Sequence, residues 1–135
     1  MAMKRTAAAG WLLLWTLAIG CTGDGLGAVS GVVSLDGRPI ENGTIEFLPA
    51  DGKGPTAAAI IEGGRYQVRV APGAKEVRIV GYRKTGERHV DPGDPSSPMI
   101  DVQDQIVPAR YNTASELRCE VGAGRGRHDF ELAVP

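Results

Sequence analysis

Few side chains in this 135-residue chain have the types and spacing that chemistry requires. The sequence contains two histidines, His89 and His128, and two cysteines, Cys21 and Cys119. Hydrolases, zinc proteases and thiol enzymes need a nucleophile, a base or a ligand set at fixed spacing. No GxSxG, HExxH or CxxC sequence is present. We therefore predict a protein that is not an enzyme, with no catalytic residue, no metal ligand and no cofactor.

A proline- and aspartate-rich segment, residues 87–105, is the strongest candidate for a binding site. Its candidate contact residues are four hard oxygen donors and a small apolar pair, namely Asp91, Asp94, Asp101, Asp104, Met99 and Ile100. Proline cannot donate to a central ladder, so we predict that the segment is not a sheet strand but a mobile, solvated loop that a partner covers. The alternatives are a disordered loop without a role and a ligand-binding loop for a glycan or Ca²⁺, although Ca²⁺ needs six or more converging oxygens.

Two further side chains are explained by packing. Cys119 alternates with Leu117 and Val121, which predicts a buried and unreactive thiol. His128 shares its parity with Phe130, which predicts a packed position at the inward-facing start of a strand.

The charge balance excludes one class of partner. The chain has 15 Lys and Arg against 16 Asp and Glu, for a formal net charge of -1. Nucleic-acid binding depends on a clustered positive excess, which is absent here. The hydrophobic fraction of 42% is sufficient for a folded core.

The N-terminus has the pattern of an export signal. Lys4 and Arg5 precede an apolar run over residues 11–20, which ends directly before Cys21. The run is shorter than the roughly 20 apolar residues that a spanning helix needs, so it favours a secretory signal peptide over an uncleaved anchor.

The sequence Leu17-Ala18-Ile19-Gly20-Cys21 resembles a bacterial lipobox, in which the cysteine becomes a lipid-modified N-terminus. The resemblance implies a signal peptide at residues 1–20, lipidation of Cys21 and a Gly-rich tether at residues 21–27. Stable anchoring needs more than one acyl chain, which such a cysteine would carry. The protein is then expected in the bacterial cell envelope, membrane-attached and facing the periplasm or the surface.

The rest of the chain, residues 28–135, predicts one all-β domain. Apolar residues recur with period 2 in several runs: 29–35, 44–47, 66–70, 76–79, 117–121 and 130–134, with a weaker alanine-rich run at 56–61. Turn-forming pairs such as Asp36-Gly37, Asn42-Gly43 and Gly63-Gly64 separate several of them. No run after the signal has helical spacing. These features predict an antiparallel β-sandwich of about seven strands.

The first two runs resemble the opening of carboxypeptidase regulatory-like domains. Residues 31–47 match the pattern G-x-V-x-x-D-G-x-P-[IL]-x-x-[GA]-x-[IV]-x-F at every fixed position. Residues 106–112 and 128–132 are similar to small lipoproteins of planctomycete-type bacteria. The resemblance implies a transthyretin-like or immunoglobulin-like sandwich that acts as an accessory module without catalysis. We therefore expect an interaction or structural module whose partners are envelope proteins or glycans.

Overall fold

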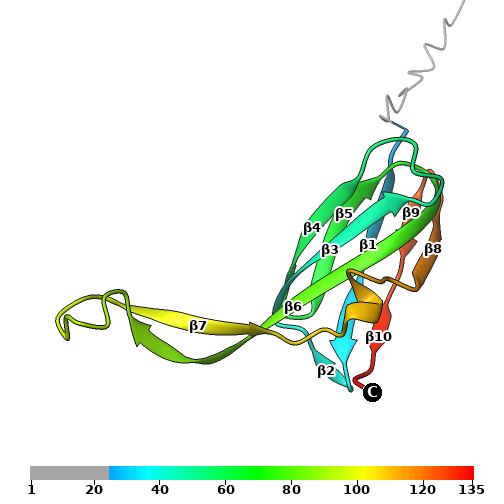
Figure 1. Ribbon diagram of the computed structural model, residues 1–135. Helices are drawn as coiled ribbons and strands as arrows, with labels where there is room; N and C mark the ends of the chain where they lie inside the picture. The colour runs from blue at the N-terminus through cyan, green and yellow to red at the C-terminus, as the bar shows by residue number, and fades with distance from the viewer. Residues whose placement is uncertain (1–24) are drawn as a thin grey trace, which may run out of the picture.

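The computed structural model describes residues 25–135 and shows a nearly all-β chain (Figure 1). The only helical element in this part is a short 3₁₀ turn, η1 (Ala109–Tyr111). The strands are β1 (Gly27–Leu35), β2 (Arg38–Pro39), β3 (Asn42–Pro49), β4 (Ala57–Glu62), β5 (Arg65–Val70), β6 (Gly73–His89), β7 (Met99–Gln105), β8 (Leu117–Val121), β9 (Arg125–Arg127) and β10 (Phe130–Leu132). The all-β prediction is confirmed. The predicted signal peptide, Cys21 and most of the predicted tether lie outside the described residues.

The strands follow the order β10-β1-β5-β4-β3-β6-β7 in a curled sheet. β9 also pairs with β1, and β8 also pairs with β6. One half of the sheet centres on the antiparallel pair β1–β5, and the other centres on β3–β6. The halves are joined through β4 and β5, which pair only at Glu62 and Arg65. The two halves therefore curl toward each other like the layers of a sandwich.

The core lies between these halves and follows from the period-2 alternation. In β1 and β5 every second side chain is buried or partly buried, as the sequence predicts. The rings of Phe47, Tyr66 and Phe130 form a row, with centroids 6.0 Å apart for the first pair and 6.4 Å for the second. The Tyr66 hydroxyl donates a hydrogen bond to the His128 carbonyl oxygen at 2.5 Å. The ring row therefore ties β3, β5 and β10 together across the core.

A glycine allows the chain before β10 to approach β1 closely. A Cβ atom added to Gly31 would lie 1.9 Å from the His128 carbonyl oxygen, a distance that no side chain tolerates. Beside it, the Val32 N–H donates to Oδ1 of Asp129 at 2.8 Å. Backbone contact at Gly31 therefore fixes the position of the C-terminal strands.

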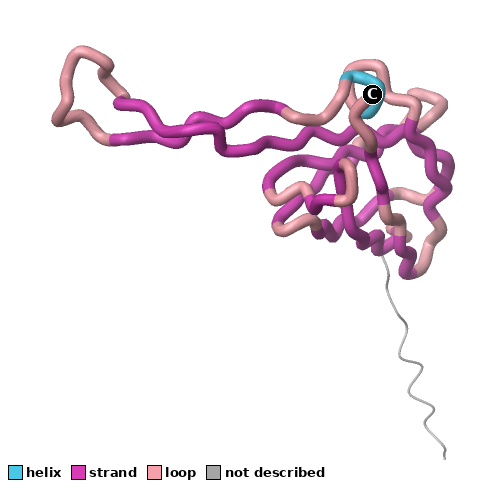
Figure 2. Tube along the Cα trace, turned by 90° about the horizontal axis from the view of Figure 1, so that it is seen from below, coloured by secondary structure: helices cyan, strands magenta, loops and turns pink. Residues whose placement is uncertain are grey.

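The region 87–105 contradicts the prediction that it lies outside the sheet. β6 runs to His89, and β7 begins at Met99 and pairs with it back to Tyr82. The physical reason is the location of three of the prolines, which all fall in the connection 90–98 and leave the ladder itself free of proline. The two strands form a long hairpin that projects from the sandwich (Figures 1 and 2). We call residues 82–105 the β6–β7 arm.

The other differences are smaller. The described chain has ten strands where about seven are predicted, because β2 and β9 are too short to show alternation and β7 has no buried face. The weaker run at residues 56–61 is confirmed as β4. Cys119 is only half-buried, because β8 is an edge strand that pairs with β6 alone. His128 is also half-buried and lies just before β10 instead of starting it.

Candidate functional site

The β6–β7 arm brings all the predicted contact residues onto one projecting element. Beyond Tyr82, β6 no longer pairs with β3, and β7 pairs with no strand other than β6. The ladder continues from Tyr82–Gln105 to His89–Met99, with one irregularity between Lys84 and Gly86. Nearly every arm residue is exposed. The arm therefore contributes surface and almost no core.

The far end of the arm, which we call the arm tip (residues 89–100), carries three exposed apolar side chains. Val90 is 54% exposed, Met99 50% and Ile100 39%. Met99 and Ile100 are among the predicted contact residues. Val90 is not, because its exposure follows from the point at which β6 ends, and the sequence does not indicate that point. Large apolar side chains at this exposure favour contact with a partner when they lie close together.

Two of the predicted acidic residues shape the loop at the tip. Asp91 accepts a hydrogen bond from the Gly93 N–H through Oδ1 at 2.9 Å. Asp94 accepts from the Ser96 N–H at 2.8 Å and from the Ser96 hydroxyl at 2.6 Å. The Ser96 hydrogen bonds hold the pKa of Asp94 below its usual value. These carboxylates therefore stabilise turns of their own loop, as aspartate commonly does.

The other two acidic residues lie along β7. Asp101 accepts from Lys84 Nζ at 2.8 Å, and Glu87 contacts the same amine at 2.8 Å. Asp101 and then Glu87 raise the pKa of Lys84 above its usual range. Asp104 lies opposite Arg83 in the ladder. Exposed ion pairs of this kind are screened by solvent and contribute little stability, so they mainly set the charge pattern of the arm.

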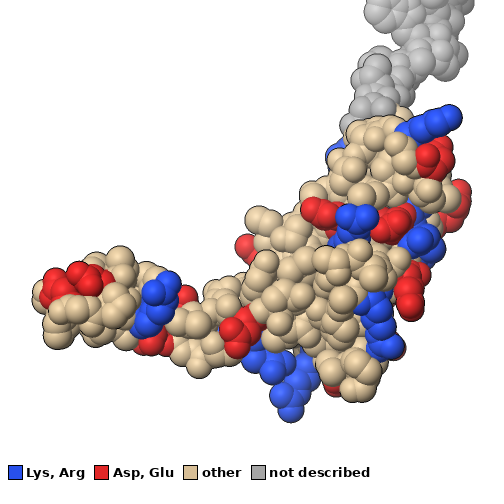
Figure 3. Space-filling view, viewed as in Figure 1, with Lys and Arg blue, Asp and Glu red and all other residues tan. Residues whose placement is uncertain are grey.

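All four predicted acidic residues of the arm are exposed. Within residues 25–135, no three His, Cys, Asp or Glu side chains are grouped as ligands for a metal ion. Figure 3 shows acidic side chains at the end of the arm, a basic group behind them and uncharged surface between. The arrangement suits a partner that combines an apolar pocket with nearby basic groups.

Cys119 belongs to β8 and not to the arm. Partial burial raises the pKa of the Cys119 thiol, which lowers its thiolate fraction and its reactivity. Cys21 lies outside the described residues. Across residues 25–135, no helix has both the length and the apolar character that a membrane crossing requires.

Comparisons with known proteins add little to this site. No protein-family model and no curated protein matches the chain. Among solved structures, the chain is similar to part of a 9R-lipoxygenase from Cyanothece PCC8801, with 14% sequence identity and a TM-score of 0.37. That similarity covers 82% of this chain and 17% of the lipoxygenase chain.

Proposed function

We propose that this protein is a lipid-anchored, non-catalytic module of the bacterial cell envelope that presents the β6–β7 arm to a partner protein. The observation that carries the proposal is the arm itself, a projecting two-stranded ribbon with an exposed apolar tip. The resemblance of residues 31–47 to carboxypeptidase regulatory-like domains and of residues 17–21 to a lipobox supports the module and its anchor.

The arm should become more stable when a partner binds to it. A two-stranded ribbon is at best marginally stable in water, because neither face is covered. The arm has this form, and its apolar tip residues Val90, Met99 and Ile100 remain exposed. Covering them at an interface adds roughly 25 cal/mol per Å² of apolar area, before the costs of association. A bound partner would therefore stabilise the arm while it gains a specific contact.

The position of the arm relative to the proposed anchor supports presentation away from the membrane. Gly27 pairs with Val70, three residues before Gly73, so β1 begins at the same end of the sandwich as β6. The arm leaves at Tyr82, nine residues along β6, or roughly 30 Å away at 3.3 Å per residue. Figure 1 shows the described chain beginning at one end and the arm leaving at the other. A tether from Cys21 to Gly27 spans at most about 20 Å, so the opposite end faces outward.

The anchor is tested by mass spectrometry of detergent-extracted protein, compared with Cys21→Ser. The proposal expects an N-terminal peptide that begins at Cys21 and carries a diacylglyceryl group in the wild type, and loss of membrane association in the variant. An unmodified peptide that runs through residues 15–25 would contradict the anchor.

The partner contact is tested by placing a photo-crosslinking amino acid at Met99 in cells that naturally make the protein. A matched control places it at Glu131, which is exposed on β10 of the sandwich body. The proposal expects a discrete crosslinked protein from position 99 that is absent from position 131. Equal crosslinking from both positions, or none from position 99, would contradict presentation by the arm.

A further inference from the structure

Two hollows, of about 530 and 490 Å³, lie where the β6–β7 arm leaves the sandwich. Arg38, Arg83 and Ile106 line both of them, so the two hollows adjoin, and we call their shared surface the arm base. Ile106 is partly buried, whereas Val134 in the first hollow is 50% exposed and Tyr82 in the second is 40% exposed. The arm base therefore includes apolar surface that nothing covers within the described chain.

Two arginines give the arm base positive charge. Arg38 and Arg83 are exposed, and neither guanidinium takes part in an ion pair within residues 25–135. The acids that line the hollows are Glu41 and Asp36, and the Asp36 carboxylate already accepts a backbone hydrogen bond from the C-terminal segment at 3.1 Å. Both guanidinium groups are therefore available to carboxylates of another chain, which arginine binds through two parallel hydrogen bonds.

The arm tip has the complementary chemistry. Residues 89–100 include the exposed Asp91 and Asp94 but no lysine or arginine. The hydrogen bonds that shape the tip loop reach only Oδ1 of each aspartate, so both Oδ2 atoms are left for a further donor. The same tip carries the three exposed apolar side chains. Acidic and apolar groups at the tip therefore match basic and apolar groups at the base.

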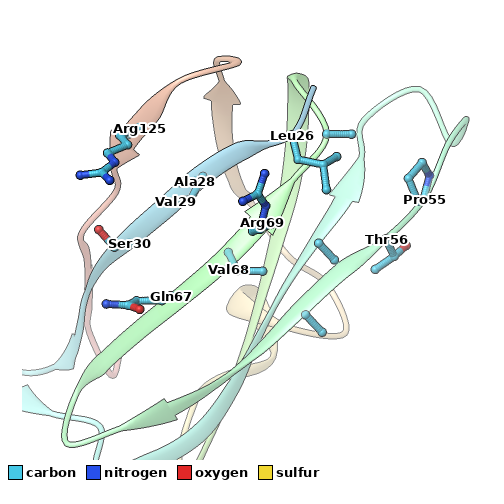
Figure 4. Close-up of a pocket in the computed structure, with 14 residues that line it drawn as sticks. Leu26, Ala28, Val29, Ser30, Pro55, Thr56, Gln67, Val68, Arg69 and Arg125 are labelled. Atoms are coloured by element: carbon cyan, nitrogen blue, oxygen red, sulfur yellow. The ribbon is translucent and has the colours of Figure 1, made fainter. Parts of the chain in front are cut away.

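The tip is held away from the base of its own chain. From Tyr82 to His89 the ladder extends roughly 23 Å at 3.3 Å per residue. A larger hollow of about 860 Å³ lies at the end of the sandwich where β1 begins, and Leu26 and Arg69 in its lining already have interaction partners (Figure 4). The arm base of a second copy is therefore the surface that fits the tip.

The direction of the arm suits contact between copies on one membrane. The arm leaves the sandwich sideways (Figures 1 and 2). Copies anchored through tethers of the same length hold their tips and bases at similar heights. A two-fold axis between two antiparallel arms brings each tip to the other base, so one symmetric arrangement satisfies both contacts.

We propose that the partner of the arm is a second copy of this chain, and that the arm tip of each copy docks at the arm base of the other. The tip aspartates meet the two base arginines, and the apolar tip side chains cover Ile106, Tyr82 and Val134. The inference rests on the proposed function, because it names the partner that the arm contacts.

The test places the photo-crosslinking amino acid at Met99 in the full chain, in cells that naturally make it, with position 131 as the control. We expect a product of twice the mass of the chain, in which position 99 is joined to the arm base of a second copy. Crosslinking of position 99 only to a different protein would overturn this inference and leave the proposed function standing, whereas no crosslink at all would contradict both. A product that joins two tips, or equal yield from position 131, would also overturn the inference.

A charge reversal tests the two arginines. Arg38→Glu combined with Arg83→Glu should lower the yield of the crosslinked dimer at least about tenfold, because each tip carboxylate then meets a like charge. Arg118→Glu combined with Arg125→Glu makes the same change of charge on β8 and β9 and should keep the yield. Glutamine at positions 38 and 83 replaces the reversal if that variant does not fold. Undiminished yield from a folded base variant would overturn the assignment to the arm base.

A mixed experiment shows in which copy the arginines act, since Arg83 also belongs to the arm. A probe-bearing chain with the reversed base is produced together with a tagged wild-type chain that has no probe. Its tip is intact, so it should still crosslink to the tagged chain while crosslinks between two reversed chains are lost. Loss of both products would overturn the assignment of the arginines to the receiving copy.

Discussion

The sandwich body and the β6–β7 arm are built from the same secondary structure but from different physical forces. Phe47, Ile45 and Ile79 in the body are fully buried, and each belongs to a strand with neighbours on both sides. The arm has a ladder of similar length, interrupted once between Lys84 and Gly86, yet its side chains remain in solvent. Strand pairing in the body is thus fixed by burial, whereas in the arm it depends mainly on the hydrogen bonds of the ladder.

We therefore expect the body to provide the stability of the protein and the arm to provide its contact with a partner. Register in a half-buried strand is strongly specified, because a shift by one residue would expose its apolar face. The arm has no buried face, so its sequence is free to serve a partner. The body should therefore determine whether the protein folds, and the arm should determine what the folded protein contacts.

The largest expected effect is the loss of a core ring. Phe47→Ala should lower the free energy of unfolding by about 3–5 kcal/mol, because Phe47 is completely buried and contacts the Tyr66 ring. Ile100→Ala on the arm should change it by less than about 0.5 kcal/mol. Urea unfolding of both variants measures the contrast, and equal effects would contradict it.

A smaller effect is expected from the buried hydroxyl of Tyr66. Tyr66→Phe removes the donor to the His128 carbonyl oxygen, leaving that oxygen without this bond, and should cost about 1–3 kcal/mol. Burial also raises the pKa of Tyr66 above its usual range, so the phenol should remain protonated in the folded protein at alkaline pH. Ultraviolet titration of the wild type and of Tyr66→Phe checks this, because the difference between the two curves isolates the Tyr66 phenol.

A pH-dependent contribution should come from Asp129 near the start of β10. Its pKa is lowered, first by the Val32 N–H and then by Arg127. A lowered pKa in the folded state means that the stabilisation is present above the ordinary value near 4 and is lost as the pH falls through the folded value. The difference in stability between the wild type and Asp129→Ala should therefore be constant above about pH 5 and shrink below about pH 4. A difference that grows in acid would refute this.

The smallest effect on stability should follow removal of the whole arm. Tyr82 and Gln105 are register partners, so an Asn-Gly turn can join them in place of residues 83–104. The melting temperature should change by only a few degrees, because the deleted segment contributes almost no core. Failure of this variant to fold would show that the arm supports the body.

The sequence predicts the body well and the arm poorly, for the same reason. The strands at residues 29–35, 44–47 and 66–70 are predictable because one face is buried, which imposes alternation. β7 has no buried face, so Met99 to Gln105 shows no alternation, and the nearby prolines suggest a loop although they occupy only the tip. Gly63-Gly64 predicts a hairpin, but nothing in the sequence indicates that the β4–β5 ladder ends after Glu62 and Arg65.

Recovery of the partner by the arm-less variant tests the central claim most directly. The protein with Asn-Gly in place of residues 83–104 should be produced, membrane-attached, in cells that naturally make it, and crosslinked in the intact envelope beside the wild type. The account predicts that the wild type recovers a discrete partner and that the folded arm-less protein loses it. Undiminished recovery of the same partner by the arm-less protein would contradict the claim that the arm makes the contact.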